Sequence, residues 1–513
     1  MRPLTPRWCS HPGPGFRIIS RKPIRQWAHP GRALWPARRI HHQKPVGSAA
    51  AIVVGAGPAG IAAVGNLLEA MPDGKIIWVD KLFEGGRIGR LLGEVPSYTT
   101  VGDFLEYARA LPTFRKICDE APAPNAVTAL EALRPGMTCL LRYAGDMLKF
   151  ITNGLLTHER VIPIAGNVTE SRFTSEQRKV VVPHPHFRRV KHLRKVYLKP
   201  HWSVTIDLIG AGRQVETIRR AAPMLVYCIG ARPRQERLPF ETSNLTLEVG
   251  LTPSRLGLVL RSDEPRKIAV VGDSLSAVLI LRNLYNLYTT THPLLKVCWL
   301  PRSRYLKFAK PDESAPGGVA NDLTGLKGEV AAFARTHLDG DALDRSPVSE
   351  LVERVVYPGQ LGLFLERTEL DTLLINLGDA DHVFQCIGYK RRTPPDTLLG
   401  PMLTRADGSK RFDFNGVTGA FYTPSMGPKG MMGLFGAGAG FPEWVFRHDG
   451  DPPEHAVGVL KFMRFLQNAV PKWVEESQRG VSELRSAPGR LGPRSNNTQD
   501  YTWKSDGNEN PEH

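Results

Sequence analysis

A chain of 513 residues with 42% hydrophobic and 23% charged side chains has the balance of a soluble globular protein with two or three domains. This composition excludes disorder over most of the length, and no apolar run approaches the roughly 18 residues that a membrane-spanning helix needs. The formal net charge of +17 does not by itself indicate a nucleic-acid partner, because ten positive charges lie at or before Lys44 with no acidic residue among them.

Residues 1–48 form a basic leader that is rich in arginine and contains serine, tryptophan and proline. The composition favours a mitochondrial transit peptide, since the continuous apolar core of a secretory signal is missing. Prolines between Pro12 and Pro36 interrupt any long amphipathic helix, which keeps open a disordered leader on a cytoplasmic protein. A second basic stretch, 184–201, lacks an RNA-binding or helix-turn-helix pattern. We expect a solvated hairpin or loop there, and no nucleic-acid partner.

Regular structure is predicted from residue 49, where a short apolar run precedes several glycines and a helical pattern over 61–70. A second strand, 75–79, ends at Asp80. Helical patterns and then strand-like segments follow, which predicts an α/β unit with an antiparallel insertion. The helical patterns cover 101–115, 125–133 and 139–157, and the strand-like segments include 179–182, 196–206 and 224–229.

The glycines after the first strand, Gly55-Ala-Gly-Pro-Ala-Gly60, match the fingerprint G-x-G-x-x-G. The pattern alone is weak in a glycine-rich chain, but a strand precedes it, a helix follows, and Asp80 ends the next strand. This is the arrangement of a dinucleotide-binding unit. In such a unit Gly55 permits a tight turn, Gly57 lets the backbone approach a pyrophosphate, and Gly60 allows close helix–strand packing. Asp80 would bind the ribose hydroxyls.

The helix after this fingerprint opens at Pro58 and Ala59, so its free N–H groups and its positive dipole end would face the phosphates. Further along, Glu84-Gly-Gly-Arg87 carries paired glycines that let a loop pass close to a pyrophosphate or a flavin edge. Arg87 adds a positive charge there. Gly86 and Arg87 are therefore candidate cofactor-binding residues.

A second strand-turn-helix unit begins at Lys267 and contains Gly272-Asp-Ser-Leu-Ser-Ala277. Ser274 replaces the middle glycine of the fingerprint, and Ala277, which is tolerated, replaces the last. The Ser274 hydroxyl could donate to a phosphate oxygen, and Ser276 lies in the same turn. We include Gly272, Ser274, Ser276 and Ala277 among the cofactor-binding candidates.

Basic residues follow the next strand of this second unit, at Arg302 and Arg304, with no acidic residue placed to bind a ribose hydroxyl. Arginines at this position can bind a 2′-phosphate bidentately, which favours NADPH over NADH. The alternative is that these cations belong to a solvated loop.

Two segments resemble each other: Met224-Leu-Val-Tyr-Cys-Ile-Gly-Ala-Arg-Pro233 and His382-Val-Phe-Gln-Cys-Ile-Gly-Tyr-Lys-Arg-Arg-Thr-Pro394. Each is a buried strand that ends at Ile-Gly and continues into basic residues and a proline. Gly230 and Gly388 suit a backbone that crosses near a bound dinucleotide. The alternative is that both segments are ordinary core strands that happen to end at a glycine.

Together these motifs resemble flavoproteins with two dinucleotide-binding domains, the superfamily of glutathione-reductase-like enzymes and flavin monooxygenases. The resemblance covers about residues 49–470 and implies that the first fingerprint binds FAD and the second binds NAD(P)H. The chain is also similar to a fungal and oomycete branch of that superfamily, through Val95-Pro-Ser-Tyr-Thr-Thr100, Gly272–Ala277 and Gly440-Phe-Pro-Glu443.

The chain departs from this superfamily in two places. The paired cysteines of the disulfide reductases are missing, because the six cysteines are scattered without a C-x-x-C pair, which also predicts no metal site. The usual terminal Gly-Asp, whose carboxylate binds the flavin side chain, is replaced by Leu434-Phe-Gly-Ala-Gly-Ala-Gly-Phe-Pro-Glu443. Backbone amides near Gly438, or Glu443, would then hold the flavin.

We therefore expect an α/β fold of two Rossmann-like dinucleotide-binding domains, with the NAD(P)H-binding domain inserted into the FAD-binding domain. The expected boundaries are a leader at 1–48, FAD-binding parts at 49–249 and 381–474, an NAD(P)H-binding domain at 250–380, and a disordered tail at 475–513.

The function that follows is that of an FAD-dependent oxidoreductase reduced by NADPH, with a monooxygenase as one form of it, acting on a small molecule with O2 or another acceptor. No catalytic acid or base and no oligomeric state can be assigned, because lone histidines such as His382 and His448 are more often structural. A non-catalytic FAD- and NADPH-binding sensor is the alternative.

Overall fold

The segment Met1–Gly47 separates from the body of the chain, Ser48–His513, and the computed structural model describes residues of that body only. The expected leader therefore lies outside the described residues. The described residues are 49–174, 177–184, 187–197, 201–209, 216–238, 243–261, 264–309, 325–357, 371, 375, 377–391, 413–422, 431–446 and 454–486.

The first sheet has seven strands, and its core is parallel. β1 pairs in parallel with β2 and β10, and β10 pairs in parallel with β20. The long β5 pairs in parallel with β2 through its first half and antiparallel with β8 through its second, which joins the expected antiparallel insertion to the sheet. In spatial order the strands are β20 (Leu434–Gly436), β10 (Met224–Tyr227), β1 (Ala51–Val54), β2 (Ile76–Asp80), β5 (Val161–Thr174), β8 (His201–Leu208) and β9 (Thr217–Ala222).

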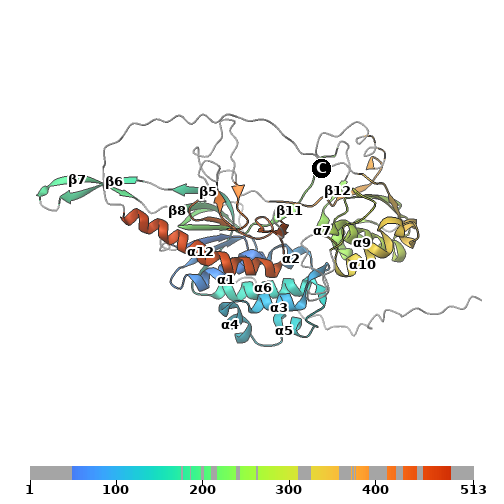
Figure 1. The fold of residues 1–513 in the computed structure, drawn as a ribbon, viewed down its shortest axis with the longest axis horizontal. Coiled ribbons are helices and arrows are strands. Elements are labelled where there is room, and N and C mark those ends of the chain that lie inside the picture. Colours follow the sequence, from blue (N-terminus) through green and yellow to red (C-terminus); the bar gives the residue numbers. More distant parts are fainter. Residues whose placement is uncertain are drawn as a thin grey trace, which may run out of the picture. The chain divides into compact units, whose positions relative to one another are not determined.

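The strands of the parallel part are apolar on both faces, as in β1, where all four residues are buried, and helices cover one of these faces. Residues of β8 pack against the other face together with Phe414, Phe421 and Phe441. Helices α1, α3, α6 and α12 pack together in one apolar cluster with strand residues of the sheet (Figure 1). The helices of this unit are α1 (Pro58–Ala70), α2 (Gly86–Leu91), α3 (Val101–Arg109), α4 (Pro112–Glu120), α5 (Ala126–Glu131), α6 (Leu141–Thr157) and α12 (Val459–Ser486).

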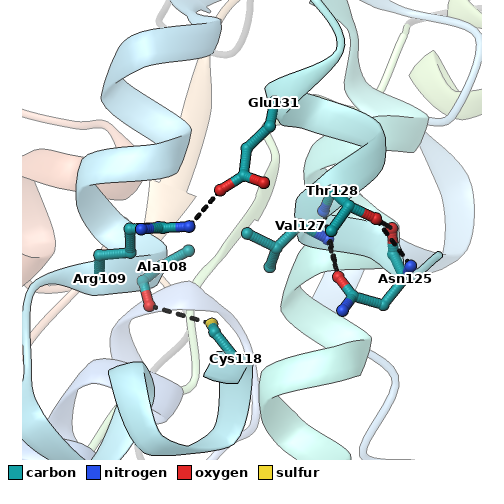
Figure 2. A network of polar contacts seen from close by, with 7 residues as sticks. All are labelled: Ala108, Arg109, Cys118, Asn125, Val127, Thr128 and Glu131. Carbon is teal, nitrogen blue, oxygen red and sulfur yellow. Dashed lines mark hydrogen bonds and ion pairs between the residues drawn. The ribbon is translucent and has the colours of Figure 1, made fainter. Parts of the chain in front are cut away.

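Short helices α3, α4 and α5 are held by local polar contacts, which Figure 2 shows. The Asn125 side-chain oxygen accepts hydrogen bonds from the backbone N–H groups of Val127 and Thr128, at 2.9 and 3.1 Å, and so caps α5. Arg109 at the end of α3 forms an ion pair with Glu131 at the end of α5. These contacts fix the helical layer without contributing to a ligand site.

The second sheet has five strands, and every strand pairing within it is parallel. Strand β13 is central and continues into α9, which reproduces the strand-turn-helix order predicted from Lys267 onward. In spatial order the strands are β12 (Ser243–Leu245), β16 (His382–Gln385), β13 (Arg266–Val271), β14 (Leu295–Leu300) and β15 (Val352–Arg354). The helices are α7 (Leu247–Leu251), α8 (Pro253–Val259), α9 (Leu275–Thr290) and α10 (Gly328–His337), with 3-10 turns η1 (Gly340–Ala342) and η2 (Pro347–Glu350).

The chain leaves the first sheet after β10, builds the second sheet, and returns at β20. This confirms the fold class, with one dinucleotide-binding fold inserted into the other. The boundaries differ from the expected 250–380, because β12 precedes this range and β16 follows it, and both pair within the second sheet. Helix α12 runs to Ser486, past the tail boundary expected at 475, and residues 487–513 lie outside the described residues. We call residues 49–238 with 413–486 the first unit and residues 243–391 the second unit.

The remaining strands form two-stranded ribbons. Strands β6 and β7 pair antiparallel, so the part of the basic stretch in β7 forms one strand of a ribbon, which agrees with the expected hairpin or loop. The ribbons pair β3 (Pro96–Thr100) with β4 (Thr138–Leu140), β6 (Gln177–His184) with β7 (Phe187–Tyr197), β11 (Ala231–Pro233) with β17 (Tyr389–Arg391), β18 (Asp413–Phe414) with β19 (Phe421–Tyr422), and β21 (Glu443–Val445) with β22 (Glu454–Ala456). Within the described part of the chain, no helix has the length and apolar character needed to cross a membrane.

Candidate dinucleotide-binding sites

The turn after β1 is built so that only glycine fits at its first position. Gly55 has a φ of +108°, a conformation that side chains with a Cβ rarely adopt. A Cβ there would lie 2.4 Å from the Cys228 carbonyl oxygen, because β10 runs directly beside β1. The tight turn predicted for Gly55 is therefore confirmed, and its cause is the neighbouring strand.

The last two fingerprint glycines meet different surroundings. A Cβ at Gly60 would lie 1.9 Å from the Gly55 carbonyl oxygen, so glycine is required for helix α1 to pack against the turn. A Cβ at Gly57 would meet only the Gly86 Cα atom, at 3.9 Å, which is an ordinary contact. The protein therefore gives no packing reason for a glycine at position 57. A ligand that approaches the backbone at the start of α1 would give one.

Three further glycines lie around this helix start. Gly86 has a φ of +67°, and a Cβ on it would lie 2.8 Å from the Gly57 Cα atom. Gly438 has a φ of +91°, and its Cβ would lie 2.7 Å from the Ala59 Cβ. Gly230 has a φ of +71° and no heavy atom within 4 Å of its ideal Cβ, although the Gly440 backbone packs against its carbonyl. Segments distant in sequence thus bring bare backbone to the start of α1.

Asp80 lies at the end of β2, and its carboxylate organises this turn. Oδ2 accepts a hydrogen bond from the Ala56 N–H at 2.9 Å, inside the fingerprint. Oδ1 accepts from the N–H groups of Leu82 and Phe83, at 2.8 and 2.9 Å. Each carboxylate oxygen can accept more than one hydrogen bond. Asp80 therefore has a structural role that the sequence pattern does not reveal, and ribose binding through its free lone pairs stays a prediction.

The second fingerprint repeats the geometry of the first. Gly272 has a φ of +113°, and a Cβ on it would lie 2.5 Å from the Cys386 carbonyl oxygen. The Ser274 hydroxyl donates to that same oxygen at 2.9 Å, so it braces the turn in this structure. Ala277 is fully buried in the second core. Gly388 has a φ of +94° with open space at its Cβ position, which matches Gly230 in the first unit.

A tryptophan supports each fingerprint turn in the same way. Trp78 on β2 donates its Nε1–H to the Gly55 carbonyl oxygen at 2.9 Å, and Trp299 on β14 donates to the Gly272 carbonyl oxygen at 2.9 Å. Both indoles are fully buried. Sequence reasoning missed this pair, although each tryptophan lies near the end of the strand that follows its fingerprint helix. The two turns are therefore matched in construction as well as in position.

The two arginines expected to bind a 2′-phosphate lie beside carboxylates. Arg302 is exposed and donates to Asp273, inside the second fingerprint, with 3.0 Å between Nη2 and Oδ1. Arg304 forms ion pairs with Asp341 and Asp344, on the far side of α10 in the sequence. Arg302 is therefore held at the fingerprint, whereas Arg304 is drawn to another loop.

A cavity of about 400 Å3 lies beside β15, and no fingerprint residue borders it. Its lining residues are Arg304, Leu343, Asp344, Ser349, Val352, Glu353, Arg354 and Val356. It is therefore no candidate for the main nucleotide site in either unit.

Arg87 points to the second unit. Its guanidinium forms an ion pair with Glu248 on α7 and lies over the ring of Tyr389, with 5.9 Å between Cζ and the ring centroid. Burial raises the pKa of the Tyr389 hydroxyl, and the nearby Ser276 side chain, in the first turn of α9, opposes that rise. Sequence reasoning missed Glu248 and Tyr389, because nothing local marks either residue as a partner of Arg87.

The other candidate groups show no catalytic arrangement. Glu443 lies on β21, and partial burial raises the pKa of its carboxyl group. Burial lowers the pKa of His382, at the start of β16, while His448 lies outside the described residues. Burial raises the pKa of the Cys228 thiol to about 12, which keeps it protonated at neutral pH. Among the described residues no cluster of histidine, cysteine and carboxylate side chains could hold a metal ion.

No established family model matches the chain. The chain is 33% identical over 431 residues to monooxygenase AgnR1 of Paecilomyces divaricatus, an alignment that covers 83% of this chain and 98% of that protein. Among solved structures, an ornithine N-hydroxylase of Kutzneria sp. 744 aligns with a TM-score of 0.43 and 16% identity, over 86% of this chain and 99% of that one. A flavin monooxygenase of Stenotrophomonas maltophilia aligns with a TM-score of 0.44 and 14% identity, over 83% and 98%.

Near-complete coverage of AgnR1 at this identity extends across both units, so the relationship includes the inserted second unit and the return to the first sheet. The two matched fingerprint turns are the features expected of proteins that bind two dinucleotides. The chain therefore belongs to the family of monooxygenase AgnR1.

Proposed function

We propose that this protein is an FAD-dependent monooxygenase that takes its electrons from NADPH. The observation that carries the proposal is the bare backbone at the start of α1, where Gly57 is a glycine that protein packing does not require. A pyrophosphate needs that close approach of the backbone. The membership in a monooxygenase family favours an enzyme over the non-catalytic sensor that the sequence left open.

The residues of the first unit fit FAD. The N–H groups of Gly57, Ala59 and Gly60 and the positive end of the α1 dipole would bind the pyrophosphate. Asp80 would accept from ribose hydroxyls, and the backbone near Gly230 and Gly438 would lie along the flavin. Bound FAD supplies hydride acceptance and the reaction of the reduced cofactor with oxygen. The protein's own residues bind and orient it, and the buried sheet beneath the turn keeps the site rigid.

The residues of the second unit fit a nicotinamide dinucleotide. The turn from Gly272 to Ser276 offers the start of α9 to the phosphates, and Gly388 leaves open space beside it. Arg302 is positioned to bind a 2′-phosphate, because it is exposed and anchored at the fingerprint through Asp273. Arg304 contributes less, since two carboxylates already hold it. This difference separates the roles of the two arginines.

NADPH preference is tested by Arg302→Ala. We expect the KM for NADPH to rise at least about tenfold more than the KM for NADH, because only NADPH carries the 2′-phosphate that Arg302 would bind. Steady-state oxidation of both nucleotides gives the two values. Arg134→Ala, an exposed arginine in the loop after α5, is the matched control and should change neither KM. Equal changes for the two nucleotides would show that Arg302 only neutralises Asp273.

A monooxygenase must also bind the organic substrate that receives an oxygen atom, and this substrate must lie beside the flavin. AgnR1 is named a monooxygenase, and we extend that reaction type to this chain, with a small organic molecule as substrate and O2 as co-substrate. The described cysteines are free, and four of the five are buried. Burial raises the pKa of the Cys298 thiol to about 11, as it does at Cys228, so thiol chemistry has little support among the described residues.

A further inference from the structure

One chain of contacts runs from the first fingerprint to the second. It begins where the backbone of Gly86 packs against Gly57, so closely that a Cβ added to Gly86 would lie 2.8 Å from the Gly57 Cα atom. Gly85 and Gly86 both have positive φ, so this loop is held in a conformation that depends on glycine. Any displacement of the loop would therefore move backbone that touches the start of α1.

The next residue, Arg87, carries the contact into the second unit. Its guanidinium pairs with Glu248, in the first turn of α7, and the two side chains are only 25% and 15% exposed. An ion pair that is largely buried is screened less by solvent than a surface pair, so its geometry is more sensitive to a new charge nearby. Arg87 also lies over Tyr389, which makes the tyrosine ring its second neighbour.

Tyr389 completes the connection. It follows Gly388, whose Cβ position faces open space; burial raises the pKa of the Tyr389 hydroxyl, and the nearby Ser276 side chain opposes that rise. Ser276 lies in the first turn of α9, where a bound dinucleotide would place its phosphates. A nucleotide there would add negative charge close to Ser276, and so near the tyrosine that Arg87 contacts.

We propose that Arg87 is a positioning residue that couples the two nucleotide sites through Tyr389 and Ser276. The inference rests on the proposed function, since it needs both nucleotides to bind. Phosphates at α9 give Arg87 a second anionic neighbour besides Glu248 and hold its side chain toward the second unit. The loop at Gly86 is then held against Gly57, so a nucleotide in the second site strengthens FAD binding in the first.

The test measures the dissociation constant of FAD with and without saturating NADP+. Linkage requires the two sites to influence each other equally, and couplings of this kind commonly reach about fivefold or more. We expect NADP+ to tighten FAD binding to the wild-type protein at least about fivefold. In Tyr389→Phe, which loses only the hydroxyl, the ratio should fall to near one while FAD affinity without NADP+ stays within about twofold. Arg87→Lys should lower the ratio as well.

A matched control comes from another contact between the same two units. Glu94 accepts hydrogen bonds from the Ser254 backbone N–H, at 3.0 Å, and from its hydroxyl, but lies outside the proposed chain. Glu94→Gln should keep the wild-type ratio.

The inference is overturned if wild type shows a ratio of one, if Tyr389→Phe and Arg87→Lys keep the wild-type ratio, or if Glu94→Gln loses it equally. A protein that binds no FAD fails the proposed function itself. A protein that binds FAD and is reduced by NADPH, but shows no coupling, fails this inference alone.

Discussion

Single residues separate packing from ligand binding most clearly at the first fingerprint. Gly60 is required by the protein itself, because a Cβ would lie 1.9 Å from the Gly55 carbonyl oxygen. Gly57 adopts an extended conformation, with φ of −81°, and a Cβ there meets nothing closer than 3.9 Å. We therefore expect opposite effects on stability from the same glycine-to-alanine substitution at these two positions of one motif.

Gly57→Ala should fold normally and bind FAD poorly. We expect the free energy of unfolding without cofactor to change by less than about 0.5 kcal/mol, because the added methyl group has room. The FAD dissociation constant should rise at least about tenfold, or ~1.4 kcal/mol, because the methyl group occupies the approach to the pyrophosphate. Urea unfolding and fluorescence titration measure the two quantities. Gly60→Ala is the control that should lose stability, and wild-type FAD affinity in Gly57→Ala would contradict the assigned role.

The sequence predicted the glycine positions well because they form one local pattern with the next strand. It did not predict where the cations point. The Arg87 partner Glu248 lies in another unit, and the partners of Arg304 follow α10, so both pairings depend on tertiary folding. A sequence motif predicts which residue type lies near a site. The ion-pair partners of that residue, which depend on the tertiary fold, determine which ligand it can contact.

At the scale of elements, the last helix completes the first core. Trp473 on α12 is 2% exposed and stacks on Phe435 of β20, with ring centroids 4.6 Å apart and planes 9° from parallel. Its Nε1–H donates to the Thr418 carbonyl oxygen at 2.7 Å. Strand β20 continues into the glycines that reach Ala59, so this helix supports one wall of the candidate FAD site.

Trp473→Ala should therefore lower the free energy of unfolding by about 3–5 kcal/mol, the usual cost of removing a buried indole. We expect the unfolding midpoint in urea to fall accordingly, and FAD to restore part of the loss by binding only the folded state. Lys472→Ala, the exposed neighbour, should change stability by less than about 0.5 kcal/mol. A loss below about 1 kcal/mol at Trp473 would show that α12 is not an integral part of this core.

Element boundaries were predicted less well than element types. The expected boundary at 380 assigns β16 to the returning part of the first domain, and the Cys-Ile-Gly sequence that follows β16 resembles the one that follows β10. The structure explains the resemblance differently: β10 and β16 occupy equivalent places beside β1 and β13, one in each sheet. The repeated ending thus reflects two copies of one architecture, which a linear comparison of segments does not assign to a sheet.

For the whole molecule, the sequence predicted two dinucleotide-binding folds with one inserted into the other, and the strand order confirms it. This succeeded because each fold begins with a fingerprint whose local geometry is nearly self-sufficient. The substrate site could not be predicted, since no compact motif marks it and the described residues show no catalytic acid or base beside the turn. The relationship to AgnR1 supports the reaction type that we propose, and the two turns support the cofactors that we propose.

The proposed function is tested most directly by one measurement. This is the anaerobic titration of the FAD-loaded protein with NADPH, followed by admission of oxygen. We predict that the purified protein takes up about one FAD per chain, as one complete first fingerprint requires. Stoichiometric NADPH should bleach its visible absorbance, and oxygen should restore it. A colourless protein that takes up no FAD, or bound FAD that NADPH leaves oxidised, would contradict the account.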